Sequence, residues 1–397
     1  MSGGTTTLPS DLIEKILWEL PTKELVRTSI LSKEWRYRWT RIPEIAFKED
    51  LIQLDYYDLN DHQLPIIIKE QQKNMRCRFF NTINQYLVLH QGPILAFTLS
   101  METTSSSADD TSIKQILLDL SRKNTVKKLR LSLVCLSSSI FSFHQLTHLH
   151  LSHCSIYNQP ASFNGFGSLT TLCLEDIYIN NKALVDILSH SPLLKSFSMH
   201  KRHDNCDNHN PTPTINDLFN YLPLIEHLGF CVRDFQWLKC IGRGEASLAP
   251  ATPFVRLKSL CLEGMCFLEE NSLRCLLHMI RSSPNLEKLK LQNMLCGNLV
   301  HWNYYFDDAF YPVTMQDYSH IRLEHLIELE IEHFYNKKPN REFVKLILAK
   351  SPVLKTVRLM VHDKDEELKM LRSLVHAPRA SPMVEIIGDY GGGKERS

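Results

Sequence analysis

One short pattern dominates the chain: an apolar residue, any two residues, an apolar residue, any one residue and a third apolar residue. It recurs about ten times, and internal repeats constrain an architecture before any other signal. The last two apolar residues of each copy alternate, as one buried face of a short strand requires. The copies are Ile94/Phe97/Leu99, Val126/Leu129/Leu131, Leu146/Leu149/Leu151, Leu169/Leu172/Leu174, Leu194/Phe197/Met199, Ile225/Leu228/Phe230, Leu257/Leu260/Leu262, Leu286/Leu289/Leu291, Leu326/Leu329/Ile331 and Leu354/Val357/Leu359.

Helical stretches separate several of these strands, as at 183–188 and 272–277. Some end in Ser-Pro just before the next strand, where proline suits the end of a helix and entry to an extended segment. These steps are Ser191-Pro192, Ser283-Pro284 and Ser351-Pro352. We therefore predict an α/β solenoid with parallel strands on a concave face and helices on a convex face. A Rossmann-type sheet is the rival, but it would not repeat one strand signature so often.

The first fifty residues have a different, helical character. Apolar residues recur at helical spacing at Leu12, Ile13, Ile16, Leu17 and Leu20. Pro21 ends that helix, and Thr22 is a natural cap for a second helix. Ser32 is a natural cap for a third, which carries Trp35 and Trp39 on one face. Three helices in about 35 residues cannot bury all their apolar surface, so the unit needs a partner.

This region resembles the plant F-box in three segments: 8–13, 20–24 and 28–39. The resemblance implies that the helices bind a Skp-type adaptor, which bridges to a cullin scaffold. The residues that match the adaptor-binding pattern are Leu8, Pro9, Ile13, Ile16, Leu17, Leu20, Pro21, Leu25, Val26, Leu31 and Trp35. The alternative is a purely structural role, in which the helices only cap one end of a solenoid.

The repeats are irregular, about 20 to 40 residues apart, against the usual 20–29 of leucine-rich repeats. This irregularity resembles plant F-box/leucine-rich-repeat proteins, and the segment Arg322 to Ile387 resembles the FBD domain that ends many of them. The matching FBD residues are 343–354 and 378–382, and a final helix around Glu366 to Leu374 would cap the stack. The expected domains are an F-box at 1–50, a connecting helical segment at 51–93, leucine-rich repeats at 94–320, FBD-like repeats and cap at 321–390, and a disordered tail at 391–397.

Composition disfavours several other classes of protein. The 397 residues are 43% apolar and 22% charged, with a formal net charge of only +1, so nucleic acid is not an expected partner. No apolar run approaches the roughly 18 residues of a membrane span, so we expect no membrane association. Eleven cysteines without a Cys-x-x-Cys pair favour a reduced compartment, the nucleus or the cytoplasm.

Candidate chemistry is sparse. The cluster at 203–209 contains His203, Cys206 and His209, but it lacks two spaced ligand pairs and runs into a proline-rich loop. No glycine-rich phosphate loop and no activated nucleophile stand out. We expect no catalytic residue, no metal and no cofactor, so any chemistry would belong to other subunits.

Residues that flank the buried apolar pair of each strand should point outward and offer a binding face. Near the start these are Lys128, Arg130, His148 and His150, and later Lys288 and Lys290. An acidic strand carries Glu328, Glu330 and Glu332, and the insertion before it carries Trp302, Tyr304 and Tyr305. We interpret these last six as candidate contacts to a bound protein. The alternatives are solvated positions on the sheet and aromatic residues that pack a loop onto its edge.

The leading hypothesis is a substrate-recognition adaptor of an SCF-type cullin-RING ubiquitin ligase, with an unidentified protein substrate. Two alternatives stay open. One is an F-box scaffold that acts outside the ligase. The other is a small-molecule-sensing F-box receptor, which would need a concentration of Lys and Arg over successive repeats.

Overall fold

The computed structural model describes residues 10–18, 20, 22–33, 35–49, 64–101, 107–133, 136, 138–156, 160, 163–179, 181–201, 221–232, 254–267, 270–294, 321–361 and 364–390. These residues divide into two compact units, 1–183 and 184–397. None of the helices in these ranges combines the length and the apolar character that a membrane span demands.

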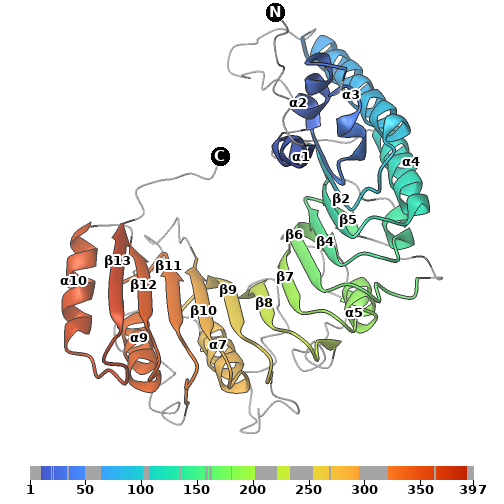
Figure 1. The fold of residues 1–397 in the computed structure, drawn as a ribbon. Helices are drawn as coiled ribbons and strands as arrows, with labels where there is room; N and C mark the ends of the chain where they lie inside the picture. Colours follow the sequence, from blue (N-terminus) through green and yellow to red (C-terminus); the bar gives the residue numbers. More distant parts are fainter. Residues whose placement is uncertain are drawn as a thin grey trace, which may run out of the picture. The chain divides into compact units, whose positions relative to one another are not determined.

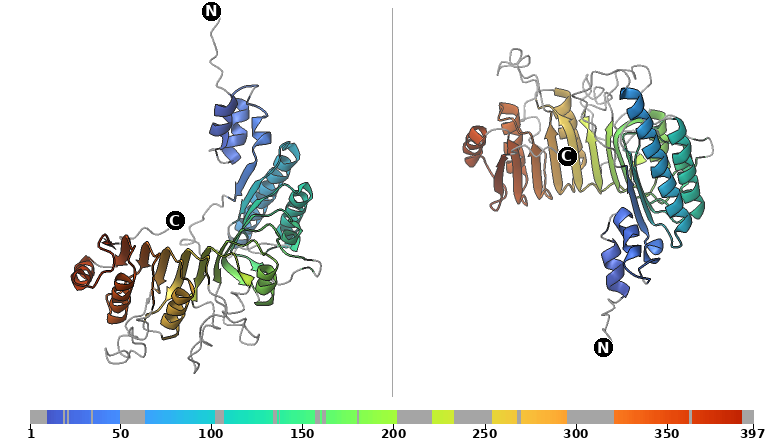
Figure 2. Two further views of the ribbon diagram at one scale, coloured as in Figure 1. Left: turned by 60° about the horizontal axis from the view of Figure 1, so that its bottom comes forward. Right: turned by 90° about the horizontal axis from the view of Figure 1, so that it is seen from above.

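Unit 1 (residues 1–183) contains a parallel sheet in the order β1 (Glu44–Lys48), β2 (Ala96–Ser100), β3 (Lys128–Ser132), β4 (His148–Ser152) and β6 (Thr171–Ile179), with β5 (Ser155–Ile156) paired to the end of β6 (Figure 1). Its helices are α1 (Ser10–Trp18), α2 (Thr22–Arg27), η1 (Thr28–Ile30), η2 (Arg38–Arg41), α3 (Leu64–Leu89), α4 (Ser107–Lys123) and η4 (Ser138–Ser142). The long helices α3 and α4 lie side by side on one side of this sheet (Figure 2).

Unit 2 (residues 184–397) contains a second run of parallel strands: β7 (Ser196–Lys201), β8 (His227–Cys231), β9 (Ser259–Met265), β10 (Lys288–Asn293), β11 (Glu328–Glu332), β12 (Thr356–Val361) and β13 (Glu385–Tyr390). Its helices α7 (Glu270–Ser282), α9 (Lys338–Lys350) and α10 (Lys364–Val375) lie on one side of those strands (Figure 1). Helix α5 (Asn181–Ser189) contains the boundary between the units.

All ten predicted strands are present, and the described residues contain three further strands that the pattern did not predict: β1, β5 and β13. β1 has the repeat spacing, at Ile42, Ile45 and Phe47, and it starts the sheet well before the expected boundary at residue 94. β13 lacks the last apolar residue of the repeat pattern, because Gly388 stands where the neighbouring strand β12 has Leu359. A side chain at residue 388 would come within 2.7 Å of Glu367 Cγ on α10, so glycine lets that helix pack closely.

The core of each unit follows from the alternation along the strands. In most strands one residue in two is buried, and the residues between them are exposed or half-buried, as in β3, whose Leu129 and Leu131 are buried while Lys128 and Arg130 are exposed. β8 is an exception, because its last four residues are all buried. We call the side of each sheet that carries these second residues its open face. The predicted orientation of the outward residues is confirmed.

Two of the predicted Ser-Pro steps close their helices with the serine hydroxyl, whereas Ser351 Oγ at the third is buried without a hydrogen-bond partner among the described residues. Ser191 Oγ donates to the Ile187 carbonyl at 2.7 Å, and Ser283 Oγ donates to the Met279 carbonyl at 2.8 Å. Both serines are buried, so these bonds satisfy hydroxyls that water cannot reach. Ser381, which precedes β13, instead donates to the Leu354 carbonyl at 2.7 Å. The step thus joins helix to strand in several repeats.

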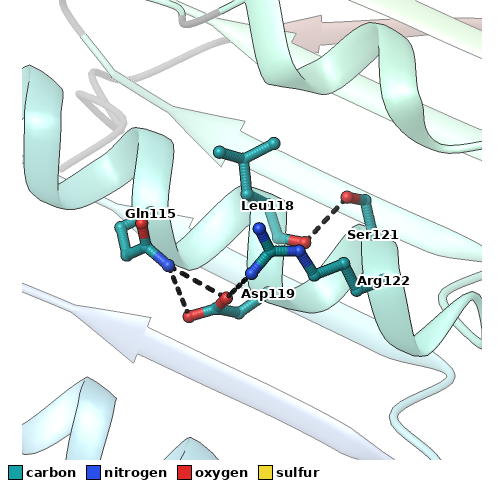
Figure 3. A network of polar contacts seen from close by, with 5 residues as sticks. All are labelled: Gln115, Leu118, Asp119, Ser121 and Arg122. Atoms are coloured by element: carbon teal, nitrogen blue, oxygen red, sulfur yellow. Dashed lines mark hydrogen bonds and ion pairs between the residues drawn. The ribbon is translucent and has the colours of Figure 1, made fainter.

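The exposed side of α4 carries a network of polar contacts (Figure 3). Asp119 accepts hydrogen bonds from Gln115 at 3.0 Å and from Arg122 at 3.0 Å. Ser121 Oγ donates to the Leu118 carbonyl one turn earlier, at 2.8 Å. Such exposed contacts three and four residues apart stabilise a helix by only about 0.2–0.5 kcal/mol each.

The third helix predicted in the first fifty residues is wrong. Ser32 Oγ accepts the Trp35 N–H at 3.3 Å, which is the predicted cap bond, but the residues that follow form turns and then the 3-10 helix η2 instead of an α-helix. Trp39 is buried, and its indole N–H donates to the Arg36 carbonyl at 3.0 Å. Trp35 is only half-buried. The tryptophan that belongs to the core is therefore Trp39.

An ion pair buried in unit 1 ties α3 to the end of β1. Arg76 Nε donates to Glu49 Oε1 at 2.9 Å, and the Glu49 N–H donates to the Ser100 carbonyl at 2.9 Å. Both side chains are nearly inaccessible to water. Losing one partner of such a pair leaves an uncompensated buried charge.

We therefore predict that Glu49→Ala lowers the free energy of unfolding by about 3–5 kcal/mol. Asp119→Ala is the control, because its exposed ion pair with Arg122 contributes less than about 1 kcal/mol. Chemical denaturation of the purified chain measures both. Equal, small effects would show that the buried pair does not hold α3 to the sheet.

Candidate functional site: the N-terminal helices and the open sheet faces

Helix α1 has two apolar rows instead of one. Ile13 and Leu17 lie one turn apart and are almost fully buried. Leu12 and Ile16, also one turn apart, are both more than two-fifths exposed. Residues four apart share one helix face, so the second row is an apolar stripe open to solvent.

The segment after α2 exposes still more apolar surface. Leu25 is buried, whereas Ile30 is 86% exposed and Leu31 is 66% exposed. Ile30 and Tyr37 line a hollow of about 560 Å³, which we call the helical hollow. Its other lining residues are Ser29, Ser32, Lys33, Arg36, Trp39, Thr40, Leu89 and Gln91. Exposed apolar residues grouped with a few polar ones are typical of surfaces that bind proteins.

An aromatic cluster fixes this segment to α3 and β1. The rings of Trp39 and Tyr86 lie 4.8 Å apart, those of Phe47 and Tyr86 lie 5.4 Å apart, and His90 stacks on Tyr86 at 5.7 Å. Gly92 donates its N–H to the Thr40 carbonyl, and a side chain there would come within 3.0 Å of the Arg41 backbone. Trp39 and Thr40, which line the helical hollow, are thus attached to α3 and to the residues that follow it.

The described adaptor-binding residues predicted from the sequence fall into three groups by burial. Ile13, Leu17 and Leu25 support the core, Ile16 and Leu31 are exposed, and Leu20, Val26 and Trp35 are intermediate. Leu8, Pro9 and Pro21 lie outside the described residues. Leu12, Ile30 and Tyr37 were not singled out as contacts, although each is an apolar residue in a segment too small to bury it.

The three glutamates of the acidic strand β11 form ion pairs with two lysines of the neighbouring strand β10. Lys288 Nζ lies 3.1 Å from Glu328, and Lys290 Nζ lies 3.0 Å from Glu330 and 2.6 Å from Glu332. Desolvation opposes the charge on Lys290, but the hydrogen bonds to Glu332 and Glu330 outweigh it and raise the pKa of this lysine. Cross-strand pairing therefore offsets most of the charge on β11.

The insertion that carries Trp302, Tyr304 and Tyr305 lies outside the described residues, as does the 203–209 cluster. The described part of the acidic and aromatic surface predicted from the sequence is therefore β11 with its partner strand β10.

Comparison with known proteins finds two matching family models. A family model for the F-box domain matches residues 6–44. A second, described as the LRR repeats of FBD-associated F-box protein At5g56370, matches residues 113–215. The F-box/FBD/LRR-repeat protein At1g13570 of Arabidopsis thaliana is 26% identical over 96% of this chain and 97% of its own length. The putative FBD-associated F-box protein At3g50710 of the same plant is 22% identical over 97% of this chain and 99% of its own.

An N-terminal F-box in front of parallel leucine-rich repeats defines the class of F-box/leucine-rich-repeat proteins. The relatives that match along the whole length add the FBD segment to this class. Over almost its whole length the chain is similar to plant F-box/FBD/leucine-rich-repeat proteins.

His90 gives this region a pH dependence. Burial, with a smaller effect of Lys123, lowers the pKa of its imidazole from the usual 6.5 to about 4. Neither ring nitrogen has a hydrogen-bond partner among the described residues. The folded chain therefore keeps His90 neutral at a pH where the unfolded chain protonates it.

We predict that His90 contributes a loss of stability as the pH falls from 6.5 towards 4, and none above 6.5. The variant His90→Gln should lose this part of the pH dependence, so its unfolding free energy falls less over that range. The difference between the two proteins isolates His90 from other buried histidines such as His278, whose pKa is also lowered. If the unfolding free energy of both proteins changed equally between pH 6.5 and 4, His90 would not be the source of this pH dependence.

Proposed function

We propose that the chain is the substrate-recognition adaptor of an SCF-type cullin-RING ubiquitin ligase, acting in the nucleus or the cytoplasm. The observation that carries the proposal is the exposed apolar surface of the N-terminal helices, at Leu12, Ile16, Ile30, Leu31 and Tyr37. These residues belong to a segment that matches the F-box, a module typical of such adaptors. A Skp-type adaptor would cover this surface and lead to the cullin.

In this role the chain supplies proximity rather than chemistry. One part holds the ligase core and another holds the protein to be ubiquitinated, so that transfer becomes effectively intramolecular. The aromatic cluster around Tyr86 suits this task, because it packs Trp39 of the helical hollow against α3 and links it through Phe47 to β1. No residue of this chain needs to touch the reacting atoms.

For the protein substrate we propose the open face of unit 2, with Glu328, Glu330 and Glu332 among the contacts. Lys288 and Lys290 already pair with these carboxylates, so a basic partner has to compete with them. Recognition would then depend on exchange of ion pairs and hydrogen bonds more than on long-range steering. The aromatic residues Trp302, Tyr304 and Tyr305 remain candidates for apolar anchors of the substrate.

We predict that Ile30→Glu abolishes binding of a purified Skp-type adaptor, because a charge would be desolvated in an apolar contact. The side chain is 86% exposed in the isolated chain, so folding should be unaffected. The matched control is Leu368→Glu, an apolar residue on α10 in unit 2 that is 54% exposed. Titration calorimetry with the full chain measures binding, and circular dichroism checks the fold.

Unchanged adaptor affinity in a folded Ile30→Glu protein would place the adaptor elsewhere. Replacing both Leu8 and Pro9 with Ala tests the opening pair of the same motif in the same assay. An intact adaptor contact without cullin recruitment or ubiquitination of bound proteins would instead support the scaffold alternative.

We predict that the triple change Glu328→Gln, Glu330→Gln and Glu332→Gln reduces capture of substrate while leaving adaptor binding unchanged. Glutamine keeps the shape of each side chain, whereas lysine would face Lys288 and Lys290 and disrupt the sheet by like-charge repulsion. Proximity labelling under proteasome inhibition, compared with the unaltered chain, measures capture. The same labelled proteins at the same level would move the recognition surface away from β11.

A further inference from the structure

Three potential metal ligands meet on the open face of unit 1. The parallel pairing of β4 with β6 places His150 opposite Cys173, and Glu175 follows two residues later on the same face of β6. His150 Nε2 lies 3.2 Å from Glu175 Oε2, and Cys173 Sγ lies 3.3 Å from Glu175 Oε1. One ligand atom from each residue lies within 4.8 Å of the other two.

These separations fit a small tetrahedral ion. Zinc bonds of about 2.0–2.3 Å to nitrogen, oxygen and sulfur put neighbouring ligands on the order of 3.5 Å apart. Because all three residues stand on adjacent, hydrogen-bonded strands, their backbones are already fixed. The two short distances reach different oxygens of Glu175, so side-chain rotations would bring one atom from each residue onto a common ion.

The ligand types select the class of metal. A thiolate and an imidazole favour zinc and similar transition metals, whereas calcium and magnesium require several oxygen ligands. The thiolate and the carboxylate together offset the two positive charges of the ion. Arg130 on β3 lies in register with His150 and is exposed, so it adds one unfavourable charge at the edge of the cluster.

We propose that His150, Cys173 and Glu175 form a binding site for a divalent transition metal, foremost Zn²⁺. Three protein ligands leave the fourth tetrahedral position open, as in zinc sites that exchange a ligand. The site lies on the open face of the sheet, where water or a donor from a bound protein can take that position. The proposal stands on the cluster alone and does not depend on adaptor binding.

Unit 2 contains a close sequence counterpart that serves as an internal control. The sequence Leu-Cys-Leu-Glu occurs at 172–175 and again at 260–263. There His200 Nε2 lies 2.9 Å from Glu263 Oε2, but the histidine comes from β7, with β8 between it and β9. Among the described residues, only the unit 1 group has three ligand atoms within reach of one another.

The test uses the purified, metal-stripped full chain and Co²⁺ as a spectroscopic substitute for Zn²⁺. We expect Co²⁺ to give the near-ultraviolet charge-transfer band of a cobalt–thiolate bond and the intense visible bands of tetrahedral cobalt. Zn²⁺ should then displace the Co²⁺. Cys173→Ser should remove the charge-transfer band, and His150→Ala or Glu175→Gln should weaken binding on the order of tenfold or more.

Two variants serve as matched controls. Cys261→Ser alters the unit 2 counterpart, and His203→Ala with Cys206→Ala alters the cluster at 203–209, and both should leave the spectrum unchanged. The proposal is overturned if the unaltered chain gives no cobalt–thiolate band. It is also overturned if the band persists in Cys173→Ser. Circular dichroism of each variant shows whether a loss of cobalt binding comes from a lost ligand or from a lost fold. Glu175→Gln keeps nearly the shape of the side chain, so weaker binding in this variant reports the loss of the carboxylate.

Discussion

The parallel pairing of neighbouring strands is the constraint on which the rest of each unit depends. At the start of a strand, one carbonyl of the preceding strand often accepts two successive N–H groups: Lys127 O accepts from Thr147 and His148, and Glu287 O accepts from Ile327 and Glu328. This repeated contact fixes the register of each pair. Register in turn decides which side chains are buried and which meet across the open face.

The N-terminal helices depend on strand pairing indirectly, through β1 and α3. β1 pairs with β2, and its Phe47 packs on Tyr86 of α3, which also holds Trp39. Core residues such as Ile13 and Leu17 then leave Leu12 and Ile16 facing outward on the same helix. A small module with apolar residues on two sides is incomplete by itself, and this incompleteness is the physical basis for assigning it a protein partner.

Local patterns predicted the strands well, because an alternating buried face is a property of neighbouring residues. Gly388 interrupts the apolar alternation of β13, so the pattern did not predict that strand. The cap bond of Ser32 is present as predicted, but turns and a 3-10 helix follow it where an α-helix was predicted. The outward direction of Glu330 was predicted, but its pairing with Lys290 was not, because the two are 40 residues apart. The His150, Cys173 and Glu175 group depends on register between strands in the same way, so no spacing rule reveals it.

The central claim is that the N-terminal helices bind the ligase core while the sheet of unit 2 stays available for another protein. Hydrogen–deuterium exchange of the full chain, with and without a purified Skp-type adaptor, tests it most directly. The account predicts that the adaptor slows amide exchange in 10–18 and 28–40 and leaves β8 to β12 unchanged. Protection on the strands of unit 2, or none in the N-terminal helices, would contradict it.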